Sequence, residues 1–295
     1  MQKRRRLGRG LEDISHYFIS QDRKKGDSTS LIEDEDDEIR YQVVSIVDLF
    51  EPRRSALFTS RIGIELCNHG IRTLVIDTDT RFPSIALMLG LSIPGYLFRH
   101  YFQEQYYPAD IIYTGSSGLK LLAPRLSIKE ICKMKTPDIV LMLKALISIE
   151  KEIDIVILRQ NEDNLQSLIE EAVFIIPAFC TSMIRVYREV KSFVAGAERK
   201  RIGIVITDAA DELAAVKAYE KISRCIEMSC GVKPYFCGYL SDISTFSTSS
   251  IIGHISKVAI ENRETVKGRR LFFDRLRSLV GVDSLTDEEI ANLLN

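Results

Sequence analysis

"VVSIVDLFEPRRSALFTSRIGIEL", residues 43–66, joins an apolar run to a polar break and then to a second apolar pattern. The first run, 43–49, is typical of a buried strand, and residues 55–68 repeat apolar side chains at the spacing of a helix. A strand, a turn and a helix in this order begin a unit that joins parallel strands through a helix. The stretch therefore predicts an α/β domain whose first turn contains neither glycine nor lysine.

The same alternation of strands and helices continues to about residue 280. Seven apolar runs are expected to be strands, at 41–49, 72–77, 119–124, 153–158, 172–177, 201–207 and 234–240. Helical patterns lie between most of them, at 55–68, 136–150, 162–171, 181–195, 210–229 and 265–279. Continuous runs of Val, Ile and Leu separated by helices indicate a parallel sheet that is covered on both faces. We expect a doubly wound, mostly parallel sheet of about seven strands, with ligands at the carboxyl ends of the strands.

Composition restricts the class of protein. The chain has 295 residues, 45% of them apolar, and a net charge of −1, which suits one large α/β domain with appendages and gives no overall bias toward nucleic acid or membrane. No apolar stretch approaches the length of a membrane span, and no signal peptide is visible. The six cysteines form no C-x-x-C pair. We therefore expect a cytoplasmic protein with reduced thiols and no metal site.

Three segments are expected along the chain. Residues 1–40 combine a basic peptide with an acidic, flexible linker that contains "EDEDDE". Residues 41–280 form the α/β domain. Residues 281–295 form a short acidic helix, which opens with Thr286 and Glu289 at the spacing of a capping box.

The most specific stretch is "GIRTLVIDTDTRFPSIALMLGL", residues 70–91, in which a strand closes on Asp77 and Asp79. Side chains two residues apart share one face of a strand, so both carboxylates are expected at one ligand site. The stretch resembles the MinD/ParA family of deviant P-loop (SIMIBI-class) ATPases, in its branch with MinD and the flagellar-number regulators. Further segments resemble that family in the same order over residues 41–279, among them "EIDIVIL" and "CGVKPYFCGYLSDISTF". The resemblance implies the fold of a P-loop NTPase.

The resemblance places the phosphate loop on "LFEPRRSA", residues 49–56, where the sequence departs from the family. Glycines let backbone N–H groups approach a phosphate closely, and a lysine contacts it, but neither residue is present. The cofactor-binding candidates at this degenerate loop are Glu51, Pro52, Arg53, Arg54 and Ser55. Each lost hydrogen bond to a charged phosphate is worth about 1.5–3 kcal/mol, so ATP binding is expected to be weaker by several kcal/mol.

Two further nucleotide-binding elements are altered. The family's second carboxylate, which supports the magnesium shell, falls on Arg159, and its adenine-reading Asn falls near Thr207 and Asp208. Asp77 and Asp79 are retained, and the resemblance implies that the second helps to position the attacking water; we interpret both as vestigial. The arginines are expected to replace the lost cation by facing Asp77, Asp79 or Glu51, with Arg159 available from a neighbouring strand end.

These departures favour a pseudo-ATPase over an enzyme. The sequence predicts no cofactor and no metal, and a bacterial MinD/ParA-like protein that docks partners to position, partition or assemble a cellular structure. The alternative is a weak ATP- and magnesium-binding switch that uses Arg53, Arg54 and the start of the helix. Family dimers form around ATP, so dimerisation stays open.

The basic N-terminus suggests a partner. "RRRLGRGLEDI", residues 4–14, resembles the peptide with which ParB-type partners engage ParA-type ATPases, and Arg9 matches the basic residue that enters the partner's site. An apolar stripe follows at helical spacing, consisting of Leu11, Ile14, Tyr17 and Phe18. Residues 1–20 are therefore expected to dock into another protein, plausibly a related ATPase. A disordered basic tail and a contact with nucleic acid or anionic membrane remain alternatives.

The segment "KGRRLFFDRLRSLVG", residues 267–281, combines an apolar helical stripe with a cationic face. This pattern fits a peripheral helix at the inner membrane. It equally fits the last helix of the domain packed on the sheet, which the 14 residues that follow it favour.

Overall fold

The structure of the protein is a computed structural model. It describes residues 41–78, 84–91, 112–115, 117–122, 149, 152–159, 169, 171–180, 182–195 and 200–241. Several predicted segments lie wholly or almost wholly outside these residues. They are 1–40, 281–295, the helices at 136–150 and 265–279, and the amphipathic stretch 267–281. Their boundaries stay predictions.

Eight strands form one sheet in the order β3-β4-β2-β5-β1-β6-β7-β8. Their bounds are β1 Gln42–Asp48, β2 Thr73–Asp77, β3 Ile112–Thr114, β4 Lys120–Leu122, β5 Ile155–Arg159, β6 Glu171–Pro177, β7 Arg201–Thr207 and β8 Tyr235–Leu240. Every neighbouring pair is parallel except β3 and β4. The prediction of a mostly parallel sheet is confirmed, and the seven predicted strands correspond to all of these except the short antiparallel strand β3.

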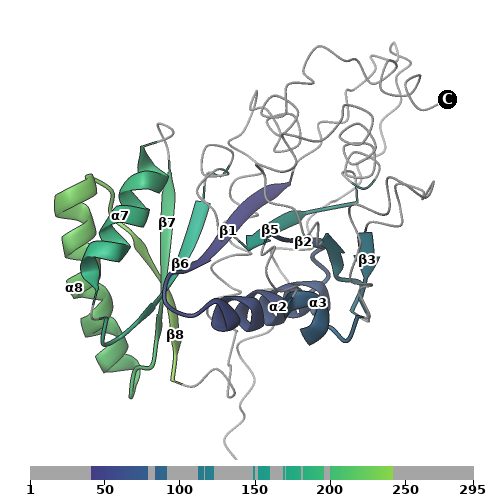
Figure 1. The fold of residues 1–295 in the computed structure, drawn as a ribbon, viewed down its shortest axis with the longest axis horizontal. Helices are drawn as coiled ribbons and strands as arrows, with labels where there is room; N and C mark the ends of the chain where they lie inside the picture. Colours follow the sequence, from purple (N-terminus) through teal and green to yellow (C-terminus); the bar gives the residue numbers. More distant parts are fainter. Residues whose placement is uncertain are drawn as a thin grey trace, which may run out of the picture. The chain divides into compact units, whose positions relative to one another are not determined.

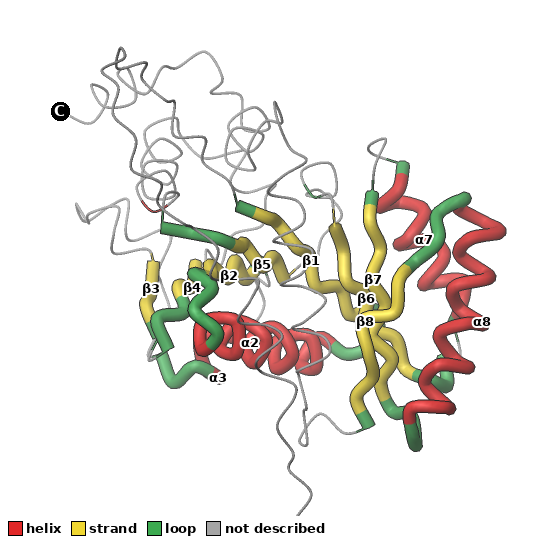
Figure 2. The backbone as a smooth tube through the Cα atoms, turned by 180° about the vertical axis from the view of Figure 1, so that it is seen from behind, coloured by secondary structure: helices red, strands yellow, loops and turns green. Residues whose placement is uncertain are grey.

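Four helices are described, namely α2 Pro52–Asn68, α3 Ser84–Met88, α7 Met183–Val194 and α8 Glu212–Cys230. Figures 1 and 2 show α7 and α8 together beside β6, β7 and β8, and α2 apart from them beneath the centre of the sheet. Two core clusters match this division, one containing buried residues of α7 and α8 and the other containing buried residues of α2. Helices therefore cover both faces, as predicted.

Alternating side chains explain how one strand supports both cores. In β6, Val173 and Ile175 belong to the cluster of α2, whereas Phe174 and Ile176 belong to the cluster of α7 and α8. All four are buried, because successive side chains of a strand point to opposite faces of the sheet. A continuous apolar run is thus required in a strand that is covered twice.

Among the boundaries that differ from those predicted, two have a clear physical reason. Helix α2 begins at Pro52 rather than at residue 55, because proline fits the first turn of a helix, where its missing N–H has no partner to lose. Glu171, which the helical pattern 162–171 included, is instead the first residue of β6 and pairs with Arg201 of β7. Pairing with the neighbouring strand therefore determines the conformation of Glu171, and the local helical pattern does not.

Four of the strands carry polar residues at their carboxyl ends. Strand β1 ends at Asp48, β2 at Asp77, β5 at Arg159 and β7 at Thr207. Asp77 and Arg159 lie directly opposite each other in the register of β2 and β5. These ends meet at the edge of the sheet where α2 begins, which is where parallel α/β sheets bind ligands.

Candidate functional site

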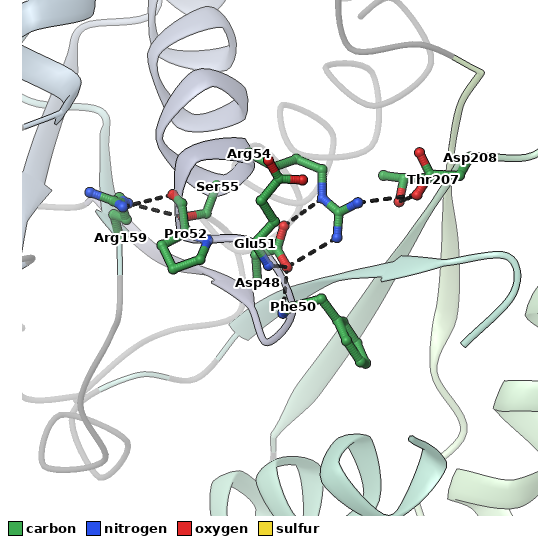
Figure 3. Close-up of polar contacts among 9 residues, drawn as sticks. All are labelled: Asp48, Phe50, Glu51, Pro52, Arg54, Ser55, Arg159, Thr207 and Asp208. Carbon is green, nitrogen blue, oxygen red and sulfur yellow. Dashed lines mark hydrogen bonds and ion pairs between the residues drawn. The ribbon is translucent and has the colours of Figure 1, made fainter. Parts of the chain in front are cut away.

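The turn between β1 and α2 contains three residues, from Leu49 to Glu51. A phosphate loop needs about six residues from its first glycine to its second. Instead of turning its N–H groups outward, this turn uses them internally, since the backbone N–H groups of Phe50 and Glu51 both donate to Asp48 Oδ1 at 2.9 Å. A carboxylate of the chain itself therefore accepts hydrogen bonds from two of the three N–H groups of this turn (Figure 3).

Arg54 joins the turn to two strand ends. Its Nε donates to Asp48 Oδ2 at 2.7 Å and its Nη2 donates to Asp48 Oδ1 at 3.2 Å, which makes a two-pronged contact. Its Nη1 donates to Asp208 Oδ2 at 3.1 Å (Figure 3). Burial acts to lower the pKa of Arg54, but the hydrogen bond and charge of Asp48 outweigh it and the pKa is raised. Arg54 is thus a fixed cation in the first turn of α2.

Arg159 makes a second bridge on the other side of the helix start. Its Nη1 donates to Asp77 Oδ1 at 2.9 Å, and both side chains are 1% exposed. Its Nε donates to Ser55 Oγ at 3.0 Å and its Nη2 donates to the carbonyl oxygen of Pro52 at 2.8 Å (Figure 3). The guanidinium therefore connects β5, β2 and the first turn of α2.

The structure brings together most of the predicted site residues. Glu51, Pro52, Arg54 and Ser55 lie at the turn and helix start, beside Arg159. The prediction that an arginine faces Asp77 is confirmed for Arg159, whereas Arg54 turns to Asp48 and Asp208. Arg53 is exposed to solvent.

The remaining predicted residues fall into two groups. Thr207 is buried at the end of β7 and its hydroxyl donates to Asp208 Oδ2 at 3.1 Å. Asp208 has a positive φ of 59°, a conformation that aspartate tolerates better than most residues. Asp79, the N-terminal partner residues 9–18 and the segment 267–281 lie outside the described residues.

Asp48 is the residue of this candidate site that the sequence interpretation missed. It is buried, and it accepts hydrogen bonds from both the turn and Arg54. A signal was present, because an aspartate at a strand end before a turn commonly accepts from backbone N–H groups two or three residues ahead. That signal would have assigned Asp48 to the turn, though not to Arg54.

Solved structures share this architecture at low sequence identity. A plasmid partition protein from Borrelia burgdorferi is 14% identical, with 77% of this chain and 100% of that chain covered at a TM-score of 0.53. Cobyrinic acid a,c-diamide synthase from Mycobacterium smegmatis is 13% identical, with coverage of 78% and 98% and a TM-score of 0.55. The cell division protein MinD from Aquifex aeolicus is 17% identical, with coverage of 81% and 97% and a TM-score of 0.50. No protein-family model matches the sequence, and no curated protein matches it significantly.

The expectation that the chain takes no cofactor is contradicted by these structures. The synthase is described with a bound ATP analogue and magnesium, and a second structure of it is described with bound ADP and magnesium. A fold that holds nucleotide and magnesium in solved structures does not support the absence of a cofactor, which had been inferred from the altered loop.

The described residues nevertheless do not fit the way in which a phosphate loop holds magnesium and phosphate. The N–H groups of Phe50 and Glu51 donate to Asp48, and Asp77 Oδ1 accepts from Arg159. A cation beside Asp77 disfavours a second cation at the same carboxylate. Within the described ranges, no group of three His, Cys, Asp or Glu side chains is placed to hold a metal ion.

Among the described helices, none combines the length and the apolar character that crossing a membrane requires.

The eight-stranded sheet with helices on both faces matches the solved structures over about four-fifths of the chain, 77–81%. The described part of the chain therefore has the fold of the MinD/ParA-type P-loop ATPases.

Proposed function

We propose that this protein docks partners to position, partition or assemble a cellular structure, and that it does not hydrolyse ATP effectively. Spatial regulation is suggested by the names of its structural neighbours, a plasmid partition protein and a cell division protein. The observation that carries the loss of hydrolysis is the buried pair of Arg159 and Asp77. It puts a side-chain cation at position 159, where the family resemblance implies a carboxylate that supports the magnesium shell.

The turn before α2 supports the same proposal. Stabilising a phosphoryl transition state requires donors and cations aimed at the phosphate oxygens. Here Arg54 is engaged by Asp48 and Asp208, and the N–H groups of Phe50 and Glu51 are engaged by Asp48. These donors therefore already bind carboxylates of the protein itself. A nucleotide, which the solved synthase holds, would be bound by this chain without being turned over.

A second candidate is the weak nucleotide switch. The observation that favours it is Arg53, which is exposed in the first turn of α2 beside the committed residues. An exposed cation at a helix N-terminus attracts anions. In this version the nucleotide would change which partner is bound, and hydrolysis would be slow.

Partner docking is proposed for the two ends of the chain. Residues 1–20, with Arg9 and the apolar stripe, would engage another protein, and residues 21–40 would act as a tether. Residues 267–281 would contact the inner membrane peripherally or pack on the domain. The protein would act in the cytoplasm, as a monomer or a dimer.

Phosphate release by the full-length protein with saturating Mg-ATP tests the loss of hydrolysis. We expect release at the level of a protein-free blank. An Asp79→Ala variant is the matched control, because the family resemblance gives Asp79 the attacking water. Release that Asp79→Ala abolishes would refute the proposal, whereas release that survives it comes from a contaminant. Calorimetry with the same nucleotide measures binding separately, so the switch is distinguished from a protein that ignores nucleotide.

A further inference from the structure

Four strand ends are connected to the first turn of α2 by the chain's own side chains. The connected residues are Asp48 of β1, Asp77 of β2, Arg159 of β5 and Asp208 directly after β7. On the helix, the contacts are made by the side chain of Arg54, the hydroxyl of Ser55 and the carbonyl oxygen of Pro52. One short segment is therefore fixed to most of the width of the sheet's carboxyl edge.

Two arginines make these connections, and both are buried. Arg159 is 1% exposed and Arg54 is 6% exposed. Each is paired with a buried carboxylate, Asp77 and Asp48 respectively. Hydrogen bonds between charged groups are about twice as strong as neutral ones, and a guanidinium offers several in a fixed plane. These two arginine bridges are therefore stiff as well as charged.

Among the described residues, the bridges pair opposite charges at this edge. Their two buried guanidinium groups match two buried carboxylates, and Asp208 is mostly exposed at 59% of its side chain. An ion pair that is complete in itself does not depend on an added ion, whereas a buried carboxylate left alone would be costly. The first turn of α2 can thus stay docked without any group brought by a ligand.

We propose that the two arginine bridges lock the carboxyl edge and the first turn of α2 in one conformation, whether or not a nucleotide is bound. In nucleotide switches, contacts from the terminal phosphate and its magnesium order a segment that is released after hydrolysis. Here the segment is already ordered by Arg54 and Arg159. A ligand shifts a conformational equilibrium only by its different affinities for two states, and a locked segment offers a single state.

This lock deepens the proposed function, and its biological role rests on that function. A locked edge makes partner docking independent of nucleotide, which suits a protein that places a structure without cycles of hydrolysis. The inference also concerns a different property from hydrolysis, because it predicts how the backbone of residues 50–58 and 73–78 responds to ligand.

Hydrogen–deuterium exchange of the full-length protein, measured with and without Mg-ATP, tests whether the two arginine bridges lock this segment. We expect peptides covering 50–58 and 73–78 to exchange equally in both conditions. In Arg159→Gln the same peptides should exchange at least about tenfold faster without nucleotide, because a broken buried ion pair raises the population of the open state. Arg72→Gln is the matched control, since Arg72 pairs with Asp154 but is 55% exposed, and it should leave these peptides unchanged.

Three outcomes would overturn the lock. One is protection of 50–58 in the wild type that rises about tenfold or more with Mg-ATP. The second is exchange in Arg159→Gln equal to that of the wild type. If Arg159→Gln does not fold, the variant Arg54→Lys is used in its place, because lysine keeps the charge but cannot reach Asp48 and Asp208 together. The third outcome is exchange in Arg54→Lys equal to that of the wild type. Phosphate release with unchanged exchange would refute only the loss of hydrolysis.

Discussion

Arg159 and Asp77 form an ion pair at 2.9 Å between the last residues of two neighbouring strands, with both side chains 1% exposed. The register places these residues directly opposite each other. Removing one member of a buried pair leaves an uncompensated charge and is far more costly than removing an exposed pair. The contact is thus a sensitive point of the fold as well as of the site.

Replacing Arg159 by Gln should lower the free energy of unfolding by about 3–5 kcal/mol, because Asp77 loses its cation inside the protein. Urea denaturation measures the change. Arg72→Gln serves as the control and should cost at most about 1 kcal/mol, since the Arg72 side chain of the pair with Asp154 is 55% exposed. Equal costs for the two variants would contradict the structural role of Arg159.

Replacing Arg159 by Asp sharpens this test. The variant puts a second carboxylate beside Asp77 and should be less stable than Arg159→Gln, because like charges repel. Added Mg²⁺ should recover part of the loss in Arg159→Asp and change little in the wild type. The melting temperature with magnesium and with a chelator provides the comparison. A magnesium-dependent rise in the wild type would count against the replacement of a cation by Arg159.

The two carboxylates that hold Arg54 should differ in importance. Asp48 is buried and Asp208 is mostly exposed, so Asp48→Asn should cost about 2 kcal/mol and Asp208→Asn at most about 1 kcal/mol. Asparagine is the suitable replacement at both positions, because it keeps an acceptor and tolerates the positive φ of Asp208. Denaturation of the two variants side by side compares these two costs. A larger cost for Asp208→Asn than for Asp48→Asn would show that Asp208 is the more important partner of Arg54.

Seven of the eight strands were predictable because each lies in an apolar run that can be recognised alone, including the three-residue strand β4 in the run 119–124. Strand β3, Ile112–Thr114, was not predicted, because its three residues alone show no period. Its antiparallel pairing with β4 is a tertiary property. Local propensity therefore indicated the parallel core and not the edge of the sheet.

The site was predictable in outline only. Arg53 and Arg54 are neighbours in sequence, but successive helix residues are rotated by about 100°, so only Arg54 faces the sheet. The pairing of Arg159 with Asp77 required knowing that β5 lies beside β2, which the family resemblance supplied. The contact of Asp48 with Arg54 was not predictable, because nothing in the sequence shows that this carboxylate turns back toward Arg54 rather than to solvent.

Deleting residues 1–20 should abolish capture of a partner and leave the melting temperature unchanged, because a tethered peptide adds nothing to the domain's core. A full-length variant with Leu11→Ser and Phe18→Ser is the matched control, since it removes apolar side chains and keeps every positive charge. Loss of capture in both indicates an apolar docking stripe. Loss in the deletion alone indicates an electrostatic contact, and capture by the deletion variant refutes docking through this segment.

Glu171 should make the stability of the protein depend on pH. It is 1% exposed at the start of β6, where it accepts hydrogen bonds from the Tyr235 hydroxyl and from Gln42 Nε2, the latter at 2.7 Å. Burial raises the pKa of Glu171 above its ordinary value of 4.5, although Tyr235, Arg201 and Gln42 act in the opposite direction. The folded protein therefore holds this proton more tightly than the unfolded chain does.

The sign follows from that difference. Between pH 4.5 and the raised pKa of Glu171, the folded state binds more protons, so the free energy of unfolding falls as the pH rises, by at most about 1.4 kcal/mol per pH unit for one proton. Glu171→Gln stays neutral and keeps an acceptor for Tyr235, so it should lose this slope. Glu152→Gln is the control with the opposite sign, because the hydrogen bond and charge of Lys120 lower the pKa of Glu152. Urea denaturation at a series of pH values measures both slopes, as the difference in the free energy of unfolding between the wild type and each variant. Parallel curves for the wild type and Glu171→Gln would show that Glu171 does not titrate in this range.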